Sequence, residues 1–149
     1  MKLFVMIVWL AGFLYAGSAK EAAGRLGAET DYQVAIEKAA REKSIVVMVV
    51  VKKNCRWCNK LLYGTLSDPE VKKALHRTVL LVVDRSDAFP KRFRETLFPS
   101  VFYVDPHSRK SLYENVGYVK KEAFLRDLDE AFKIRSALYA PESQGGEDG

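Results

Sequence analysis

The sequence is poor in the side chains that bind metals and haem, with only two histidines and two cysteines among its 149 residues. A structural zinc site needs four ligands at short spacings, and His76 and His107 have no such spacing. A c-type haem attachment needs a histidine directly after the second cysteine, where this chain has Asn59. These scarcities exclude haem attachment, count against a zinc site and indicate that both histidines are surface residues.

The sequence also has no excess of charge of one sign. The formal net charge is only +5, and charged residues of both signs make up 29% of the chain. Nucleic-acid binding calls for a basic stripe with interleaved aromatic residues, and none is evident. With 48% hydrophobic residues, the composition is that of one globular domain rather than a disordered or multi-span membrane protein. The slight basic excess is still compatible with acidic partners or anionic membrane surfaces.

Residues 1–19 have the pattern of a secretory signal peptide. Lys2 is followed by an apolar or small-residue run from Leu3 to Ala16, and then by Gly17-Ser18-Ala19. A spanning helix needs roughly 20 apolar residues, so this run is short for a membrane anchor. We therefore expect cleavage after Ala19, rather than retention as an anchor, and export to an oxidising compartment such as the periplasm. No cysteine lies near the site, so a lipid anchor through cysteine is not available.

Hydrophobic periodicity and turn residues predict four strands and four helices in the remaining chain. The expected strands are 45–51, 78–83, 100–104 and 111–116. The expected helices begin at Thr30 or Asp31, at Cys55, at Ser67 or Asp68 and at Lys120, and the last runs to about Tyr139. Residues 20–29 are expected to be a linker, 30–139 the folded domain, and 140–149 a disordered tail.

The order of these elements predicts an α/β domain with a mixed sheet of about four strands flanked by helices. The run 45–51 is almost entirely β-branched and lacks polar alternation, which predicts a central strand covered on both faces. Strand, helix and strand in succession form a crossover unit, so the first two strands should be parallel. The short link at 105–110 predicts an antiparallel hairpin for the last two.

The two cysteines are spaced as Cys55-Arg56-Trp57-Cys58 directly after the first strand. Such a pair at the start of a helix is typical of dithiol redox chemistry. The helix dipole and the cations of Arg56 and Lys52 should favour a thiolate, and so a lowered pKa, at Cys55, which makes it the candidate nucleophile. Cys58, one turn further, should resolve the mixed disulfide, and Trp57 should be an exposed apolar contact. A purely structural disulfide would close too small a loop to stabilise the fold strongly.

The whole of 30–139 resembles the thioredoxin-like superfamily, and within it the exported thioredoxin-like proteins. The segments that carry the resemblance are Lys53–Cys58, Ser67–Val71, Val82–Asp84, Phe98–Asp105 and Gly117–Tyr118. The resemblance implies a thioredoxin-like fold with a cis Phe98–Pro99 bond lying against the cysteines. Because Pro99 has no N–H, it leaves the adjacent edge open to an extended substrate. Arg56, Trp57, Phe98, Pro99 and Ser100 are the expected substrate-binding residues.

The function that this resemblance implies is thiol–disulfide exchange with client proteins that carry cysteine pairs. We expect a reductase, acting as a monomer without cofactor or metal and kept reduced by a membrane-bound electron donor. One departure concerns the buried acid that many thioredoxins have in the central strand, because residues 46–51 contain no carboxylate. Glu37 or bound water are the candidate replacements. The rival interpretation is a redox-inactive carrier or chaperone that binds extended segments at the open edge.

Overall fold

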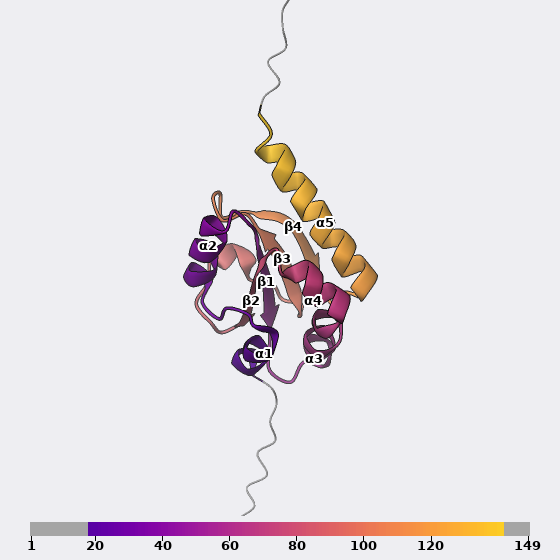
Figure 1. Ribbon diagram of the computed structural model, residues 1–149. Coiled ribbons are helices and arrows are strands. Elements are labelled where there is room, and N and C mark those ends of the chain that lie inside the picture. Colours follow the sequence, from indigo (N-terminus) through magenta and orange to yellow (C-terminus); the bar gives the residue numbers. More distant parts are fainter. Residues whose placement is uncertain (1–17, 142–149) are drawn as a thin grey trace, which may run out of the picture.

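The computed structural model describes residues 18–141, and a four-stranded sheet forms its centre (Figure 1). The strands are β1 (Val46–Val51), β2 (Val79–Asp84), β3 (Ser100–Val104) and β4 (Ser111–Val116), and their order is β2-β1-β3-β4. β1 pairs with β2 in parallel and with β3 antiparallel, and β3 and β4 form an antiparallel hairpin. This confirms the predicted mixed sheet, its crossover unit and its hairpin.

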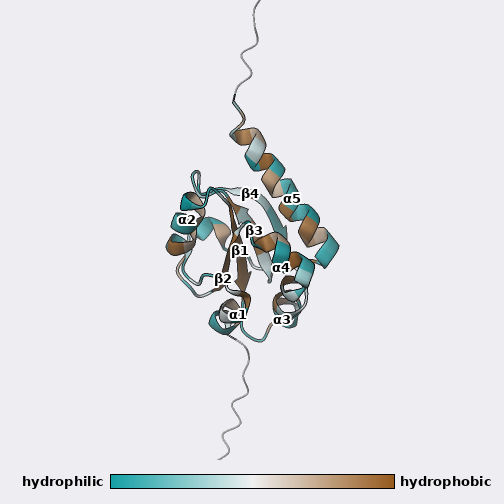
Figure 2. Ribbon diagram, in the orientation of Figure 1, coloured by the Kyte–Doolittle hydropathy of each residue, from teal (hydrophilic) through white to brown (hydrophobic). Residues whose placement is uncertain are grey.

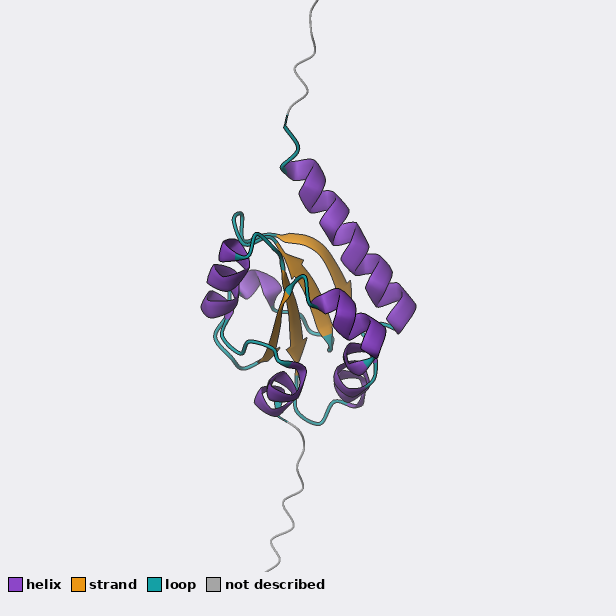
Figure 3. Ribbon diagram, viewed as in Figure 1, coloured by secondary structure: helices purple, strands orange, loops and turns teal. Residues whose placement is uncertain are grey.

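Within residues 18–141, five α-helices pack around the sheet, and Figure 3 shows helices in purple outside the orange strands. They are α1 (Ala19–Leu26), α2 (Tyr32–Arg41), α3 (Arg56–Tyr63), α4 (Pro69–Leu75) and α5 (Lys121–Leu138), with short 3₁₀ turns η1 (Thr65–Ser67) and η2 (Lys91–Phe93). The helix expected over 55–66 is divided at Gly64, where an added Cβ would lie 2.5 Å from the Lys60 carbonyl oxygen. Glycine permits this close approach, and the chain then turns toward α4.

Both faces of β1 are covered, as its continuous β-branched sequence predicts. Val46, Met48 and Val50 point to the layer formed by α2 and η2, and the alternate residues point to the layer of α1, α3, α4 and α5. Every residue of β1 is buried. Figure 2 shows β1 in brown, the colour of hydrophobic residues, and the surrounding helices in alternating teal and brown. Apolar burial on two faces therefore fixes the strand from which the cysteines follow.

The prediction of a linker over residues 20–29 is wrong, because this segment contains most of α1. Ala19, Ala22 and Ala23 form a small buried stripe, which is easily missed when only large apolar side chains are counted. Ser18 Oγ accepts a hydrogen bond of 3.2 Å from the Glu21 N–H at the start of the helix. After α1, the Glu29 N–H donates to the Leu80 carbonyl at 2.8 Å, so the segment also covers the outer edge of β2.

Two predictions concern residues outside this description. The signal peptide predicted for 1–19 overlaps the described residues only at Ser18 and Ala19, and the predicted tail overlaps them only at Ala140 and Pro141. Both therefore stay predictions. Between residues 18 and 141, no helix has the length and apolar content that crossing a membrane requires.

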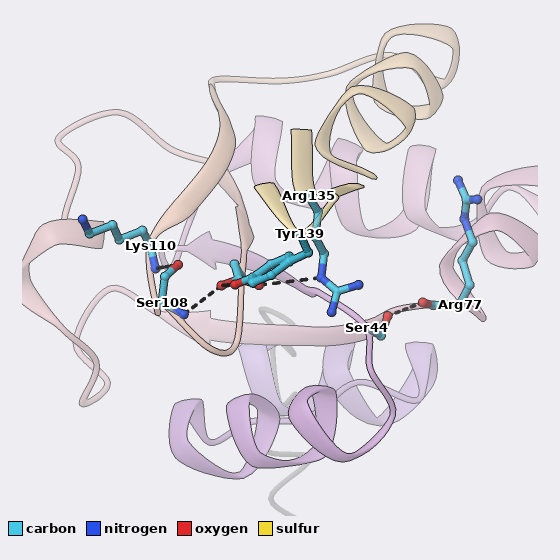
Figure 4. Close-up of polar contacts among 7 residues, drawn as sticks. Ser44, Arg77, Ser108, Lys110, Arg135 and Tyr139 are labelled. Atoms are coloured by element: carbon cyan, nitrogen blue, oxygen red, sulfur yellow. Dashed lines mark hydrogen bonds and ion pairs between the residues drawn. The ribbon is translucent and has the colours of Figure 1, made fainter. Parts of the chain in front are cut away.

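A buried carboxylate joins the end of α5 to the turn between β3 and β4. Asp105 is fully buried, and its Oδ2 accepts hydrogen bonds of 2.7 Å from the Ser108 N–H and 2.7 Å from the Tyr139 hydroxyl. Arg135 Nε lies 3.6 Å from Oδ1 of the same side chain. Figure 4 shows Tyr139, at the end of α5, pointing toward Ser108, with Arg135 beside it. Burial by itself would raise the pKa of Asp105, but these hydrogen bonds outweigh it and lower the pKa.

A second buried polar group offers a test of the packing under α5. Tyr103 is fully buried against Tyr113 and Phe124, and its hydroxyl has no hydrogen-bond partner among the described residues. Burial and the nearby Asp127 carboxylate raise the pKa of Tyr103, so the hydroxyl is neutral. We expect Tyr103→Phe to increase the free energy of unfolding by about 1 kcal/mol, since it removes an unpaired buried hydroxyl.

Urea denaturation of the Tyr103→Phe protein would measure this change. The half-buried neighbour supplies the control, because Tyr113→Phe should alter stability by no more than about 0.5 kcal/mol. A loss of stability in Tyr103→Phe alone would show that the hydroxyl is hydrogen-bonded in the folded protein.

Candidate functional site

The cysteine pair lies where β1 ends and α3 begins. After Val51 the chain turns through Lys52, Lys53 and Asn54, and Asn54 has a φ of 54°. Asparagine adopts this left-handed conformation more readily than most residues. Cys55 then occupies the N-cap position of α3. The stiff buried strand and the tight turn thus hold the first sulfur at the positive end of the helix dipole.

Cys55 and Cys58 form a disulfide, with their Cα atoms 5.2 Å apart. The Cys58 N–H donates to Cys55 Sγ at 3.2 Å. Cys55 retains 7% of its surface, whereas Cys58 retains 1%. Cys55 is thus the outer and Cys58 the inner sulfur of the pair, and their roles as nucleophile and resolving cysteine stay predictions. In the reduced protein the same N–H would stabilise a thiolate at Cys55.

The loop before β3 lies directly against the outer sulfur. The Phe98–Pro99 bond is cis, as the resemblance implies, and the Phe98 carbonyl oxygen lies 3.9 Å from Cys55 Sγ. The Gly117 N–H donates to the Pro99 carbonyl at 2.8 Å, and Gly117 has a φ of 101°, which favours glycine. Two loops therefore meet beside the disulfide.

Ser100 was expected to bind substrate, but its side chain does not reach the surface. Its side chain is fully buried, and its hydroxyl donates to the Leu97 carbonyl at 2.7 Å. Pro99 is buried as well, whereas Phe98 is half-buried and Leu97 is 65% exposed. Ser100 thus shapes the loop from inside, and Leu97, which the sequence reasoning missed, is the exposed apolar side chain. The sequence signal that could have indicated Leu97 as a site residue is its position two residues before Pro99.

Beside the cysteine pair, Trp57, Lys60 and Tyr118 form an aromatic–lysine patch. Trp57 is 48% exposed, which confirms its predicted exposure, and its ring centroid lies 5.5 Å from that of Tyr118. Lys60 Nζ lies 5.0 Å from the Trp57 centroid and 4.7 Å from the Tyr118 centroid. Arg56 also lies over Trp57, at 5.8 Å. Such cation–π contacts hold the charges in place while leaving them near solvent.

Lys60 and Tyr118 were not among the predicted site residues. Tyr118 belongs to one of the segments that carry the family resemblance, and Lys60 follows the second cysteine by two residues. Nothing in their spacing along the chain shows that they meet. The loop containing Gly117 brings them together, through its backbone hydrogen bond to Pro99.

The strand that leads to the cysteines, β1, carries no carboxylate. Val47, Val49 and Val51 share the buried cluster of Cys55 and Cys58, and all three are apolar. Glu37 does not replace the missing acid, because it lies exposed on α2 against the opposite sheet face and accepts a hydrogen bond from Gln33 at 2.9 Å. The expectation for Glu37 is therefore wrong, since its helix covers the other layer.

The remaining candidate ligands lie elsewhere. His76 and His107 are both exposed, as predicted. Between residues 18 and 141 there is no group of three or more histidine, cysteine or acidic side chains that could hold a metal ion. A cavity of about 460 Å³ lies between α1, α2 and α4, but no residue of the site just described lines it.

A family model described as the thioredoxin-like domain matches residues 32–132. The chain belongs to the thioredoxin-like domain family. The match covers most of the chain and includes both cysteines, the Phe98–Pro99 loop and most of α5. The protein thus combines the fold of the thiol–disulfide oxidoreductases with a disulfide-forming cysteine pair at the start of a helix.

Solved structures agree with this fold. A thioredoxin from Thermus thermophilus superimposes with a TM-score of 0.65 and 19% identity, covering 80% of this chain and 98% of that one. The C-terminal domain of Neisseria meningitidis DsbD, in its oxidised form, gives 0.57 and 21%, covering 70% and 98%. A structure described as DsbH oxidoreductase gives 0.54 and 18%, covering 72% and 88%. Among curated proteins, no sequence matches the chain significantly.

Proposed function

We propose that the protein is an exported thiol–disulfide oxidoreductase that reduces disulfides of client proteins. The observation that carries this proposal is the asymmetry of the pair. Cys55 Sγ accepts the Cys58 N–H at the start of α3 and is the more exposed sulfur, and the Phe98 carbonyl lies 3.9 Å away. A thiolate in this position is both stabilised and accessible.

The reaction follows from the two positions. The Cys55 thiolate attacks one sulfur of a client disulfide, the client S–S bond breaks, and the other client sulfur leaves as a thiolate that takes a proton from water. Cys58 then loses its proton and attacks Cys55 Sγ, which forms the internal disulfide and releases the second client thiolate. Two electrons have moved to the client.

Water is the proposed carrier of the proton from Cys58, because the residues of β1 beside it are apolar. Val49 and Val51 lie in the same buried cluster, and Glu37 lies on the opposite face. A membrane-bound dithiol donor is the proposed source of electrons for the next cycle, by the same exchange in reverse. The exposed Trp57 and Leu97 provide apolar contacts for the client.

The purified protein tests this proposal in two measurements. It should exchange disulfides with a model protein substrate, and its reduction potential against glutathione should lie near −270 mV, as for a reductase. A potential near −120 mV would instead assign it to the oxidants. Failure to exchange with any model disulfide would contradict the proposed activity.

Export is tested separately. The mature protein recovered from the exported fraction should begin after Ala19, as N-terminal sequencing would show. Recovery of the whole chain, with Met1 intact, from the soluble intracellular fraction would contradict export without affecting the proposed chemistry.

A further inference from the structure

Phe98 also lines a small cavity, which the proposed mechanism does not use. Its volume is about 320 Å³. Its lining is Val50, Arg85, Phe89, Arg94, Glu95, Thr96 and Phe98. Binding pockets for whole small molecules span roughly 300–1,000 Å³, so this volume is at the lower limit and suits a single side chain.

Phe98 connects the cavity to the reacting sulfur. Its carbonyl oxygen lies 3.9 Å from Cys55 Sγ, while the residue also lines the cavity. A client sulfur bonded to Cys55 would therefore be within a residue or two of the cavity. In an extended segment, side chains two residues apart point to the same side. The cavity and the reacting sulfur thus share Phe98 as a neighbour.

The rim of the cavity is held by hydrogen bonds and is positively charged. Arg94 Nη1 donates to the Arg85 carbonyl at 2.7 Å, and Nη2 donates to the Asp87 carbonyl at 3.1 Å. The same guanidinium lies 4.5 Å from the centroid of Phe89. Arg94 therefore holds the loop and fixes one wall of the cavity.

Arg85 is the cation left available. Its side chain is exposed and forms no ion pair with any residue between 18 and 141. Lys52 adds a second cation nearby, with Nζ 5.8 Å from the Phe98 centroid. Glu95 is the single carboxylate in the described lining. An apolar floor with a cationic rim favours an occupant that is apolar and borders on a negative charge.

We propose that this cavity is a specificity subsite of the oxidoreductase, which receives one large apolar side chain of the client within two residues of its reacting cysteine. Arg85 pairs with a client carboxylate beside that side chain. The inference rests on the proposed function and deepens it, because it assigns the substrate class as extended, acidic-flanked segments with an aromatic or aliphatic residue near the cysteine.

Disulfide-bonded model peptides test the subsite. One set carries Phe two residues before or after the cysteine with an adjacent Asp, a second replaces Phe by Ala, and a third replaces Asp by Lys. The reduced wild-type protein should react with the better Phe–Asp peptide at least about tenfold faster than with its Ala counterpart, as expected when a buried aromatic contact is lost. The Lys peptide should also be slower.

Two variants make the test specific. For each variant the measured quantity is the ratio of the exchange rates with two peptides, so that an effect on the overall reactivity of the protein cancels. Arg85→Glu should reverse the preference for Asp over Lys, and Thr96→Trp, which fills the mouth, should remove the preference for Phe over Ala. The control is Lys110→Glu, which makes the same change in net charge at the exposed turn at the other end of β3. Its ratios should match the wild type.

The outcomes separate this inference from the proposed function. Equal rates for the Phe and Ala peptides in the wild type, with normal exchange, would contradict the subsite and leave the oxidoreductase intact. Unchanged Asp–Lys ratios in Arg85→Glu would contradict the role of Arg85. No reaction with any peptide or with a small disulfide such as oxidised glutathione would contradict the proposed function itself.

Discussion

Replacing Cys55 by Ser is expected to abolish disulfide exchange, whereas Cys58→Ser is expected to accumulate a stable mixed disulfide with the client. The difference follows from exposure and hydrogen bonding. Cys55 retains 7% of its surface and accepts the Cys58 N–H at 3.2 Å, while Cys58 retains 1%. Only the outer sulfur can be reached, and only the inner one can resolve the adduct.

Non-reducing gel electrophoresis and mass spectrometry of each variant after mixing with a model disulfide protein would measure this result. Because both substitutions are isosteric and remove the same disulfide, each controls for the structural effect of the other. A mixed disulfide that forms through Cys58 in Cys55→Ser would contradict the assigned roles. Client binding that survives in both variants, together with no exchange in the wild type, would favour the redox-inactive carrier or chaperone.

The second prediction with a large expected effect concerns the stability of the fold, at a residue outside the cysteine site. We expect Asp105→Ala to lower the free energy of unfolding by about 3 kcal/mol, because the Ser108 N–H and the Tyr139 hydroxyl lose their acceptor and Arg135 loses a charge partner. Urea denaturation would measure the change. Asp68→Ala, which removes the N-cap of α4, should cost only about 1 kcal/mol and serves as a control.

The same network predicts a pH dependence. The hydrogen bonds to Asp105 place its pKa below the usual value of 3.8 despite its burial, so the ionised form is the one that the fold stabilises. This contribution is complete above the unfolded pKa of about 4 and is lost as the pH falls through the lower folded pKa. Asp105→Asn should therefore lose less stability than the wild type between about pH 5 and pH 2. Parallel acid profiles for the two proteins would contradict this assignment.

Most of the architecture could be predicted because local pattern and tertiary structure agree. The β-branched run before the cysteines becomes the two-sided strand β1, and Ser100–Val104 and Ser111–Val116 begin and end where turn residues indicate. The alanine helix α1 could not be predicted in this way, since its buried face consists of small side chains. Its burial depends on β2, which lies more than 50 residues later in the chain.

The residues of the candidate site also differ in whether the sequence could predict their positions. The positions of Cys55, Cys58 and Trp57 could be predicted because they depend on neighbours within one helical turn, and such short-range geometry is visible in sequence. Ser100 and Glu37 were placed wrongly because the inward turn of one and the sheet face of the other are tertiary facts. Lys60 joins Tyr118 only through the folded chain, so no spacing rule indicates their contact.

The pairing of Glu29 with β2 has a consequence for behaviour at high concentration. A strand at the border of a sheet offers its free N–H and C=O groups to any similar strand, including one from another molecule. Residues 28–30 occupy part of that border at β2, through the bonds of Glu29 to Leu80 and Val82. Within residues 18–141 the unprotected border is therefore β4, where Glu114 stands midway along the strand. A charge on that border disfavours the pairing of copies edge to edge.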